Sequence, residues 1–155
     1  MTTKIQKGDC EIIVAHGEFL AKARLIREQY IEVLRVLHGD DFTVSSEQFN
    51  SLLNNSNEII IFVIYERVIL STAQASLSKT PPKHHVYINN VATHSDYHER
   101  GLGGMCMEKL LAEIKKQWGS DVIIELTNNP EKGNSGFYKE LGFEEKDTAV
   151  LCYCE

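Results

Sequence analysis

The chain has little positive charge and no long hydrophobic run. Its 16 Lys and Arg residues are outnumbered by 22 Asp and Glu residues, which gives a formal net charge of −6. Proteins that bind nucleic acid or an anionic membrane need clustered Lys and Arg, so we expect neither partner. An acidic balance suits a cationic substrate such as an amine. No stretch is long enough to span a bilayer and none resembles a signal peptide, so we expect a cytoplasmic protein.

Cysteine is also scarce. The four cysteines are Cys10, Cys106, Cys152 and Cys154, and in the cytoplasm they are expected to be reduced. Cys152 and Cys154 share a face of a predicted strand, but a zinc site there would need more ligands, and only His84 and His85 are obvious. We therefore expect no metal. With 155 residues, of which 43% are hydrophobic, the chain can bury a core without metal or disulfide, as a single domain over residues 1–155.

The hydrophobic pattern alternates between strand and helix periods. Apolar positions at helical spacing predict long helices over residues 19–37 and 101–118, and shorter ones over 45–53 and 134–141. Apolar runs, often β-branched, predict strands at 11–15, 58–65, 67–77, 85–93, 121–127 and 149–153. The unit of strand 85–93, helix 101–118 and strand 121–127 requires that its two strands run parallel. The fold class is therefore α/β, a mixed sheet with helices packed on it.

The most informative segment is the turn before helix 101–118. It holds three glycines within four residues, Gly101, Gly103 and Gly104. Glycines let backbone N–H groups approach a ligand, and the first amides of a helix lack intrahelical partners and lie at the positive end of its dipole. Such a turn suits a pyrophosphate, although a turn that merely starts a helix has the same composition. Neither a Walker loop nor a dinucleotide fingerprint fits, because no Gly-Lys-Ser/Thr follows and Cys106 stands where a glycine is needed.

Two motifs resemble those of the GNAT superfamily of N-acetyltransferases. The segment His98-Glu99-Arg100-Gly101-Leu102-Gly103 resembles the Arg/Gln-x-x-Gly-x-Gly/Ala sequence with which that family binds acetyl-CoA, and the preceding Val91-Ala92-Thr93-His94-Ser95-Asp96-Tyr97 resembles the family's approach to it. Downstream, Asn134-Ser135-Gly136-Phe137-Tyr138-Lys139-Glu140-Leu141-Gly142-Phe143 is similar to the family's Asn…Phe-Tyr-x-x-x-Gly-Phe helix.

The nearest subgroup is that of the glucosamine-6-phosphate N-acetyltransferases, because segments 30–37 and 45–49 resemble its first two helices. The sequence departs from the subgroup at three places. His98 replaces the usual Arg or Gln, Asn89-Asn90 replaces an acidic pair, and the C-terminus lacks the usual basic residues.

The resemblance implies the GNAT fold, with a mixed, mostly antiparallel central sheet of about six strands and helices on both faces. Acetyl-CoA is implied as the co-substrate, in contact with Val91, Ala92, Thr93, His98, Glu99, Arg100, Gly101, Leu102, Gly103, Gly104, Asn134 and Tyr138. The implied acceptor contacts are Asn89, Asn90 and Glu125. A backbone N–H near Val91 to Thr93 is expected to polarise the acetyl carbonyl, because the family splays this strand from the next.

Two residues are predicted to move protons. Tyr138 is the candidate general acid, because a phenol with a pKa of about 10 is protonated at neutral pH and can donate to a departing thiolate. Without the resemblance it would be an aromatic core residue. Glu125, an acid in an otherwise apolar strand, is the candidate general base, directly or through water, with a solvated outward-facing acid as the alternative. His94 is the second candidate base, and Cys106 is expected to pack in the core.

The predicted function is direct transfer of acetyl from acetyl-CoA onto a primary amine of a small molecule. An amino-sugar phosphate is the first candidate acceptor, and a polyamine or other small cationic amine is the second. Acetylation of a protein N-terminus or lysine, and a non-catalytic acyl-CoA-binding module, are alternatives that the sequence leaves open. The apolar strand predicted at 149–153 would lie at a sheet edge, and its cover by a second subunit predicts a homodimer.

Overall fold

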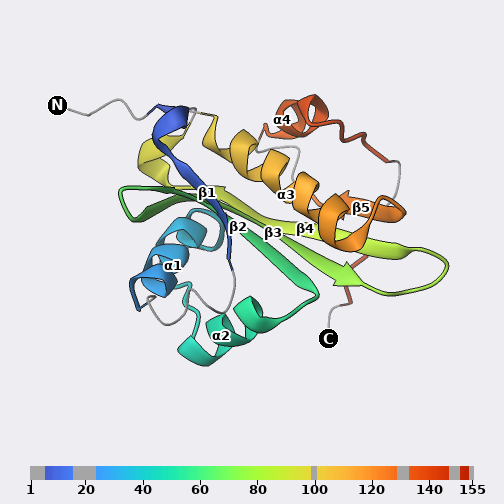
Figure 1. The fold of residues 1–155 in the computed structure, drawn as a ribbon, viewed down its shortest axis with the longest axis horizontal. Helices are drawn as coiled ribbons and strands as arrows, with labels where there is room; N and C mark the ends of the chain where they lie inside the picture. Colours follow the sequence, from blue (N-terminus) through green and yellow to red (C-terminus); the bar gives the residue numbers. More distant parts are fainter. Residues whose placement is uncertain (1–5, 16–23, 99–100, 129–132, 147–150, 154–155) are drawn as a thin grey trace.

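Five strands form one mixed sheet in the part of the chain that the structure, a computed structural model, describes: residues 6–15, 24–98, 101–128, 133–146 and 151–153. Their order in the sheet is also their order in the chain (Figure 1). The strands are β1 Glu11–Val14, β2 Glu58–Tyr65, β3 Val68–Ser78, β4 His84–Thr93 and β5 Val122–Leu126. The α-helices among these residues are α1 Arg24–His38, α2 Ser46–Asn54, α3 Leu102–Trp118 and α4 Ser135–Glu140, and short 3-10 helices lie at Lys7–Asp9 (η1) and Ser95–Tyr97 (η3).

Tight turns and one crossover determine the strand directions. Strands β1 to β4 pair antiparallel in succession. Glu66 and Arg67 join β2 to β3 with φ angles of 46° and 68°, the left-handed conformations that a two-residue hairpin turn requires. Strands β4 and β5 pair in parallel because α3 carries the chain back across the sheet between them. The parallel unit predicted from the sequence is confirmed.

Helices cover both faces of the sheet, as predicted (Figure 1). On one face, α1 and α2 bury Ile60 and Phe62 of β2. On the other, α3 buries the alternate residues Ile59 and Ile61 of the same strand, and α4 packs there beside α3. We call these the α1–α2 face and the α3–α4 face. Because β2 is buried on both, it needs the continuous apolar run that its sequence shows.

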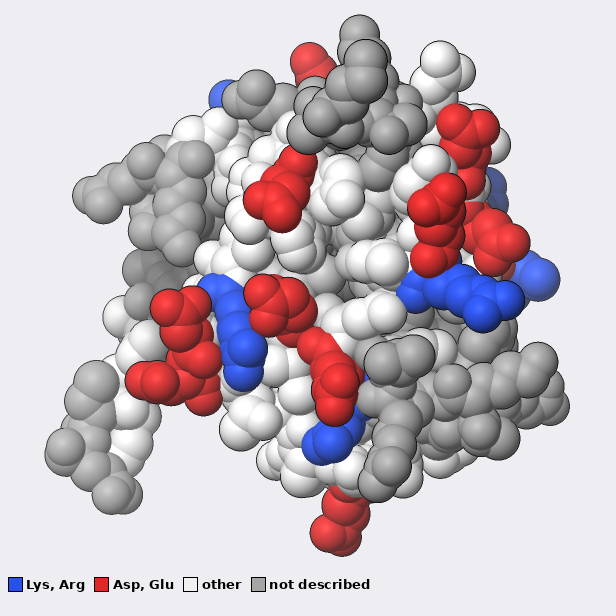
Figure 2. Space-filling model, turned by 90° about the vertical axis from the view of Figure 1, so that its left-hand side faces the viewer, with Lys and Arg blue, Asp and Glu red and all other residues white. Residues whose placement is uncertain are grey.

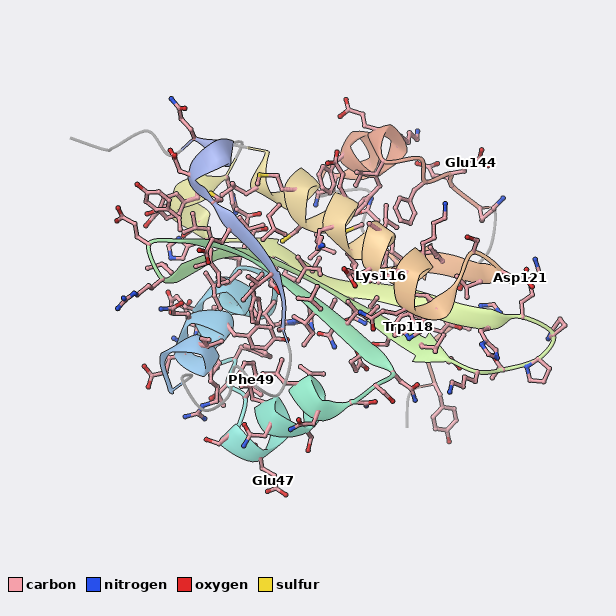
Figure 3. All side chains as sticks on the ribbon, in the orientation of Figure 1. Glu47, Phe49, Lys116, Trp118, Asp121 and Glu144 are labelled. Carbon is pink, nitrogen blue, oxygen red and sulfur yellow. The ribbon has the colours of Figure 1, made fainter. Side chains whose placement is uncertain are left out.

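The short helix α2 shows how local sequence and packing agree. Ser45 Oγ accepts from the Gln48 backbone N–H at 3.1 Å, and Gln48 Oε1 accepts from the Ser45 N–H at 3.0 Å, which forms a capping box. In Figure 3, Phe49 points toward the sheet and Glu47 points away from it. The Phe49 ring is buried against Tyr30 of α1, with ring centroids 5.3 Å apart. The cap therefore orients the helix so that its apolar side meets the sheet.

The prediction of a sixth strand at residues 149–153 is wrong over its described part. Residues 151–153 form no strand, and Leu151 and Tyr153 are 91% and 90% exposed, while residues 149 and 150 lie outside the described part of the chain. An apolar run becomes a strand only where a neighbour accepts its backbone hydrogen bonds, and the apolar pattern does not supply that neighbour. The homodimer was predicted from this strand and remains a prediction.

The surface carries charge of both signs. Figure 2 shows the side of the molecule that bears η1, α1 and the β2–β3 turn, where acidic and basic side chains are interspersed and the described residues form no broad basic patch. No helix within the described ranges is long and apolar enough to cross a membrane. The described residues also contain no group of His, Cys, Asp and Glu suited to a metal ion.

Candidate active site

Strands β4 and β5 stop pairing halfway along β4. The last paired residues are Ile88 and Leu126, and within the described residues β4 then continues to Thr93 with β3 as its one strand partner. Beyond Ile88 the backbone groups on the β5 side of β4 therefore have no strand partner in the described residues, and the Thr93 carbonyl accepts from His98 instead. We call this point the β4–β5 divergence. It is the splaying that the family resemblance implied for this strand.

A β-bulge lies in β4 directly beyond the divergence. Between the paired residues Asn89 and Ala92, β4 supplies two residues, Asn90 and Val91, where β3 supplies one. Asn90 has a φ of 52°, a left-handed conformation that Asn adopts more readily than most residues. The extra residue changes which way the following side chains face, so that Ala92 is buried in the α1–α2 core.

Helix α3 begins close to the end of β4. Gly101 occupies its N-cap with φ 74° and ψ 13°, and because glycine has no side chain, the first-turn amides receive no cap bond from it. A β-carbon on Gly103 would lie 3.6 Å from Cζ of Phe137 in α4 and 3.6 Å from Oγ1 of Thr93 in β4. The end of β4, the start of α3 and α4 therefore meet at one junction, whose free amides suit an anion.

Two histidines hold the turn between β4 and α3. Nε2 of His98 lies 2.7 Å from the carbonyl oxygen of Thr93, and because a carbonyl only accepts, Nε2 carries the proton. Nδ1 of His94 accepts from the backbone N–H of Asp96 at 3.2 Å. His98 was predicted as a cofactor contact and His94 as a second candidate base, and the structure gives each a bond to the backbone of the turn that the sequence did not indicate. The predicted cofactor contacts at residues 99 and 100 lie outside the described residues.

Tyr138 is half-buried on the α3–α4 face. Its ring packs edge-on against Phe137 and Phe143, with centroids 5.0 Å and 6.0 Å away. Burial raises the pKa of the Tyr138 hydroxyl above its ordinary value, which keeps the phenol protonated. The structure therefore places a protonated hydroxyl on the helix that meets the junction through Phe137. Cys106 is fully buried in α3, and burial raises the pKa of its thiol to about 12, as a core residue requires.

Asn134 stands at the start of α4, but its side chain makes no capping bond. The backbone carbonyl of Asn134 accepts from the Tyr138 N–H at 3.3 Å, so that the two residues lie one helical turn apart, as predicted. The nearby Ser135 Oγ instead accepts from Nδ2 of Asn128 at 3.2 Å. The contact between Asn134 and the cofactor remains a prediction.

Glu125 lies on the opposite face of the sheet from Tyr138. It pairs with Tyr87 one row before the divergence, and its Oε1 is 3.5 Å from Nδ1 of His85. The Glu125 side chain is 49% exposed, so the carboxylate is solvated. The structure therefore does not bring the two predicted proton-transfer residues together on one face, and only a substrate reaching through the divergence could meet both.

Sequence reasoning missed a set of polar side chains on the α1–α2 face: Tyr30, His38, Glu58 and Gln74. Gln74 is buried and hydrogen-bonded to Tyr30, Glu58 and Asn90. The signal that could have found these residues is a polar side chain inside an apolar strand, because such a group must find a partner when it is buried. Gln74 in β3 and Glu58 at the start of β2 both have this signal.

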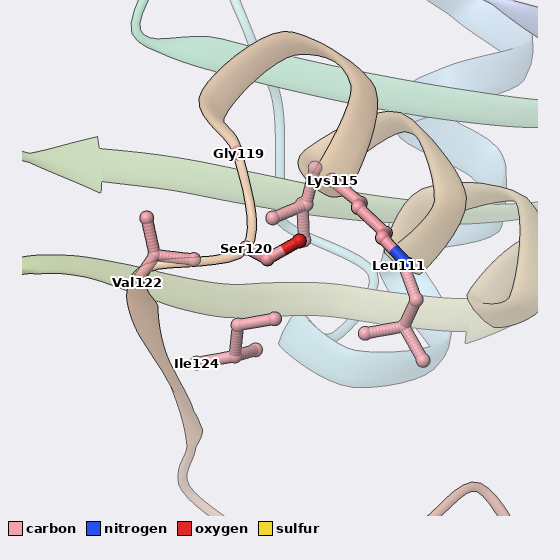
Figure 4. A pocket seen from close by; sticks show the side chains of 7 residues that line it. Leu111, Lys115, Gly119, Ser120, Val122 and Ile124 are labelled. Carbon is pink, nitrogen blue, oxygen red and sulfur yellow. The ribbon is translucent and has the colours of Figure 1, made fainter.

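A cavity of about 310 Å³ lies between the C-terminal end of α3 and β5 (Figure 4). It is lined by Leu111, Ile114, Lys115, Gly119, Ser120, Val122 and Ile124. Its lining on α3 begins at Leu111, which lies about 14 Å along the helix from Leu102, so the cavity is in the C-terminal half of α3. None of the residues predicted for the site lines it.

The arrangement of strands and the helix start can be compared with known proteins. The model of the acetyltransferase (GNAT) family matches residues 24–143. The probable N-acetyltransferase san of Drosophila melanogaster is 25% identical over 127 residues, which cover 79% of this chain and 67% of that protein.

Solved structures share the whole architecture at low identity. An aminoglycoside acetyltransferase, meta-AAC0020, from an uncultured soil metagenomic sample has a TM-score of 0.78 at 16% identity, covering 96% of this chain and 97% of that one. Glucosamine-6-phosphate N-acetyltransferase from Arabidopsis thaliana has a TM-score of 0.72 at 19% identity, covering 94% and 99%. These proteins are named for different substrates, so the likeness supports the fold and not the predicted subgroup. The match over residues 24–143 shows that the chain belongs to the acetyltransferase (GNAT) family, and it is an acetyl-CoA-dependent acetyltransferase.

Proposed function

We propose that the protein transfers the acetyl group of acetyl-CoA directly onto a primary amine of a small molecule at the β4–β5 divergence. One observation carries this proposal. The unpaired end of β4 and the first turn of α3 meet through Thr93 and Gly103, so the open backbone of a strand and the free amides of a helix lie side by side. The two sets of groups suit a carbonyl and a pyrophosphate of one ligand.

The residues at the junction fit acetyl-CoA. The first-turn amides from Gly101 to Gly104 would hold the pyrophosphate, and the backbone of β4 from Val91 to Thr93 would hold the arm and polarise the carbonyl. Gly103 leaves the space between Thr93 and Phe137 free of a side chain. When bound, acetyl-CoA supplies an activated acetyl thioester.

Two side chains would handle protons in this proposal. Tyr138 holds a proton on its hydroxyl, which it can donate to a departing thiolate of similar basicity. Glu125 is solvated and on the other face, so it would accept the proton of the amine through water. Holding amine and thioester in one site would supply several kcal/mol of the barrier through proximity, on the order of 7–11 kcal/mol at most.

The acceptor would approach from the α1–α2 face, where the sheet carries carboxylates. Glu58, Ser76, Tyr87 and Glu125 pair in one row across β2, β3, β4 and β5. At about 4.8 Å between strands, the Cα atoms of the two glutamates are about 14 Å apart. The described side chains that strands β2 to β5 turn to this face include these two carboxylates and no Lys or Arg.

Two acceptor classes were predicted from the sequence, an amino-sugar phosphate and a polyamine. A phosphate needs basic partners, whereas separated ammonium groups of a linear amine match separated carboxylates. The charge of the α1–α2 face therefore favours a polyamine or similar cationic amine, with the amino-sugar phosphate as the second candidate.

The helix start is tested with two matched glycine variants. Gly101→Ala forces a residue with a β-carbon into the left-handed region, which costs about 1–2 kcal/mol of stability. Gly119, at the other end of the same helix, has φ 87° and ψ −178°, a region that essentially only glycine adopts, so Gly119→Ala costs at least as much. We expect Gly101→Ala to raise the Kd for acetyl-CoA about tenfold or more, which corresponds to a loss of about 1.4 kcal/mol in binding free energy. Gly119→Ala should lose at least as much stability and still keep the wild-type Kd, measured by titration calorimetry. Equal Kd values for both variants would place the cofactor elsewhere.

Removing the Tyr138 hydroxyl should abolish turnover without affecting binding. Tyr138→Phe is expected to lower kcat by about 100- to 10,000-fold, because the proton donor is lost. Because burial raises the pKa of Tyr138, wild-type turnover should persist into alkaline pH and fall only as the pH rises through that raised pKa. Tyr153→Phe, which removes the hydroxyl of an exposed tyrosine, is the control. A Tyr138→Phe enzyme with wild-type kcat would make Tyr138 a core residue only.

The acceptor is tested by measuring free CoA thiol with acetyl-CoA and a panel of spermidine, glucosamine 6-phosphate and a peptide with a free N-terminus. We expect the highest kcat/KM with spermidine, and a loss of about 100-fold or more in Glu125→Gln, because this variant removes the proposed proton acceptor together with a carboxylate that pairs with an ammonium group. A higher kcat/KM with glucosamine 6-phosphate would select the second candidate. No release with any amine of the panel would place the acceptor outside these three classes and contradict the proposal.

A further inference from the structure

A chain of hydrogen bonds crosses the α1–α2 face from β2 to the end of α1. Oε2 of Glu58 accepts from Nε2 of Gln74 at 3.0 Å. Oε1 of Gln74 accepts from Nδ2 of Asn90 at 3.1 Å and from the Tyr30 hydroxyl at 3.4 Å. Oδ1 of Asn90 lies 2.9 Å from Nε2 of His38, the last residue of α1. The chain therefore ties helix α1 to the bulge of β4.

The carboxylate of Glu58 fixes the direction of every bond in this chain. A carboxylate only accepts, so Gln74 must turn its N–H to Glu58 and its carbonyl oxygen to Asn90. Asn90 then turns its N–H to Gln74 and its carbonyl oxygen to His38, which must hold a proton on Nε2. Ser76 Oγ donates to the same Glu58 oxygen at 2.7 Å and so fixes the position of the charged end.

Asn90 is the member that lies in the bulge. Its φ is 52°, and both polar ends of its side chain are bonded, one to β3 and one to α1. The backbone that follows, from Val91 to Thr93, carries the N–H that is expected to polarise the acetyl carbonyl. Because a misplacement of about 1 Å can cost on the order of 100-fold in rate, the side chain that holds the bulge affects the chemistry through the backbone, a role separate from the acceptor contact that the family resemblance implies for Asn90.

We propose that Asn90 is a positioning residue for acetyl transfer, held by Glu58 and Gln74 on one side and by His38 on the other. The inference rests on the proposed function in one respect, that acetyl transfer takes place at the β4–β5 divergence. If Asn90 positions the backbone in this way, His38 acts on the reaction through Asn90. No other chemical role is predicted for His38, which is the last residue of α1.

Asn90→Gly separates the side chain from the backbone conformation. Glycine adopts the positive φ at no steric cost, so this variant keeps the bulge accessible and loses only the two side-chain bonds. We expect kcat with acetyl-CoA and the best amine of the panel to fall about 10- to 100-fold, with little change in the KM for acetyl-CoA. Gln117→Ala, which removes a 3.0 Å amide–carboxylate bond to Glu113 on α3, is the control and should keep the wild-type kcat.

At the other end of the hydrogen-bond chain, a conservative substitution of His38 should rescue kcat. His38→Ala removes the donor to Asn90 and should lower kcat in the same way, whereas His38→Gln places an amide N–H at a similar distance from Cβ and should restore most of it. A wild-type kcat in both Asn90→Gly and His38→Ala would overturn the proposal. Equal losses in His38→Ala and His38→Gln would also overturn it, because the hydrogen bond would not be the cause.

A readout without turnover keeps this test separate from the proposed function. The backbone amide resonance of Val91 should shift in His38→Ala and return toward its wild-type position in His38→Gln, since both variants lack the imidazole ring and only one lacks the donor. If wild type acetylates none of the amines, the proposed function fails, and this resonance then decides whether the side chain of residue 38 holds the bulge. An unmoved Val91 resonance in His38→Ala would overturn the proposal in either case.

Discussion

The parallel ladder between β4 and β5 ends at Ile88 and Leu126, and the rest of the site depends on that short pairing. If the ladder continued to Thr93, the backbone groups on that side of the second half of β4 would be hydrogen-bonded to β5. Strand β4 remains ordered beyond this point because β3 pairs with it on the other side up to Thr93. The sheet thus holds a strand firmly along one edge and leaves the other edge open next to the start of α3.

The two faces of the sheet divide the chemistry. The α3–α4 face supplies the glycine-rich helix start and the half-buried, protonated Tyr138, which suit the cofactor. The α1–α2 face supplies solvated or hydrogen-bonded carboxylates and amides, which suit an amine. In the proposed function, the thioester and the amine would reach the β4–β5 divergence from opposite faces of the sheet, so they would not compete for the same groups.

Much of the fold follows from the sequence because its elements have strong local signals. Strand 58–65 was predicted with its observed bounds, since a β-branched run buried on both faces has no other stable form. The start of α3 directly after β4 was also predicted, because three glycines follow the strand, and Gly101 adopts the left-handed φ that favours glycine. The prediction of a strand at 149–153 failed because an apolar run does not specify which strand it pairs with. Residues 151–153 are exposed and form no strand. The bonds of His38, Asn90, Gln74 and Glu58 could not be predicted, because they join residues far apart in sequence whose contact depends on the register of three strands and the end of a helix.

The most direct test of this account is the site at which acetyl-CoA binds. In a titration of the ¹⁵N-labelled protein with acetyl-CoA, the largest changes in amide resonances should fall on Val91 to Thr93 and on Leu102 to Gly104, the end of β4 and the start of α3. Changes concentrated on Leu111, Val122 and Ile124 would place the cofactor in the apolar cavity at the other end of α3, and would contradict the account.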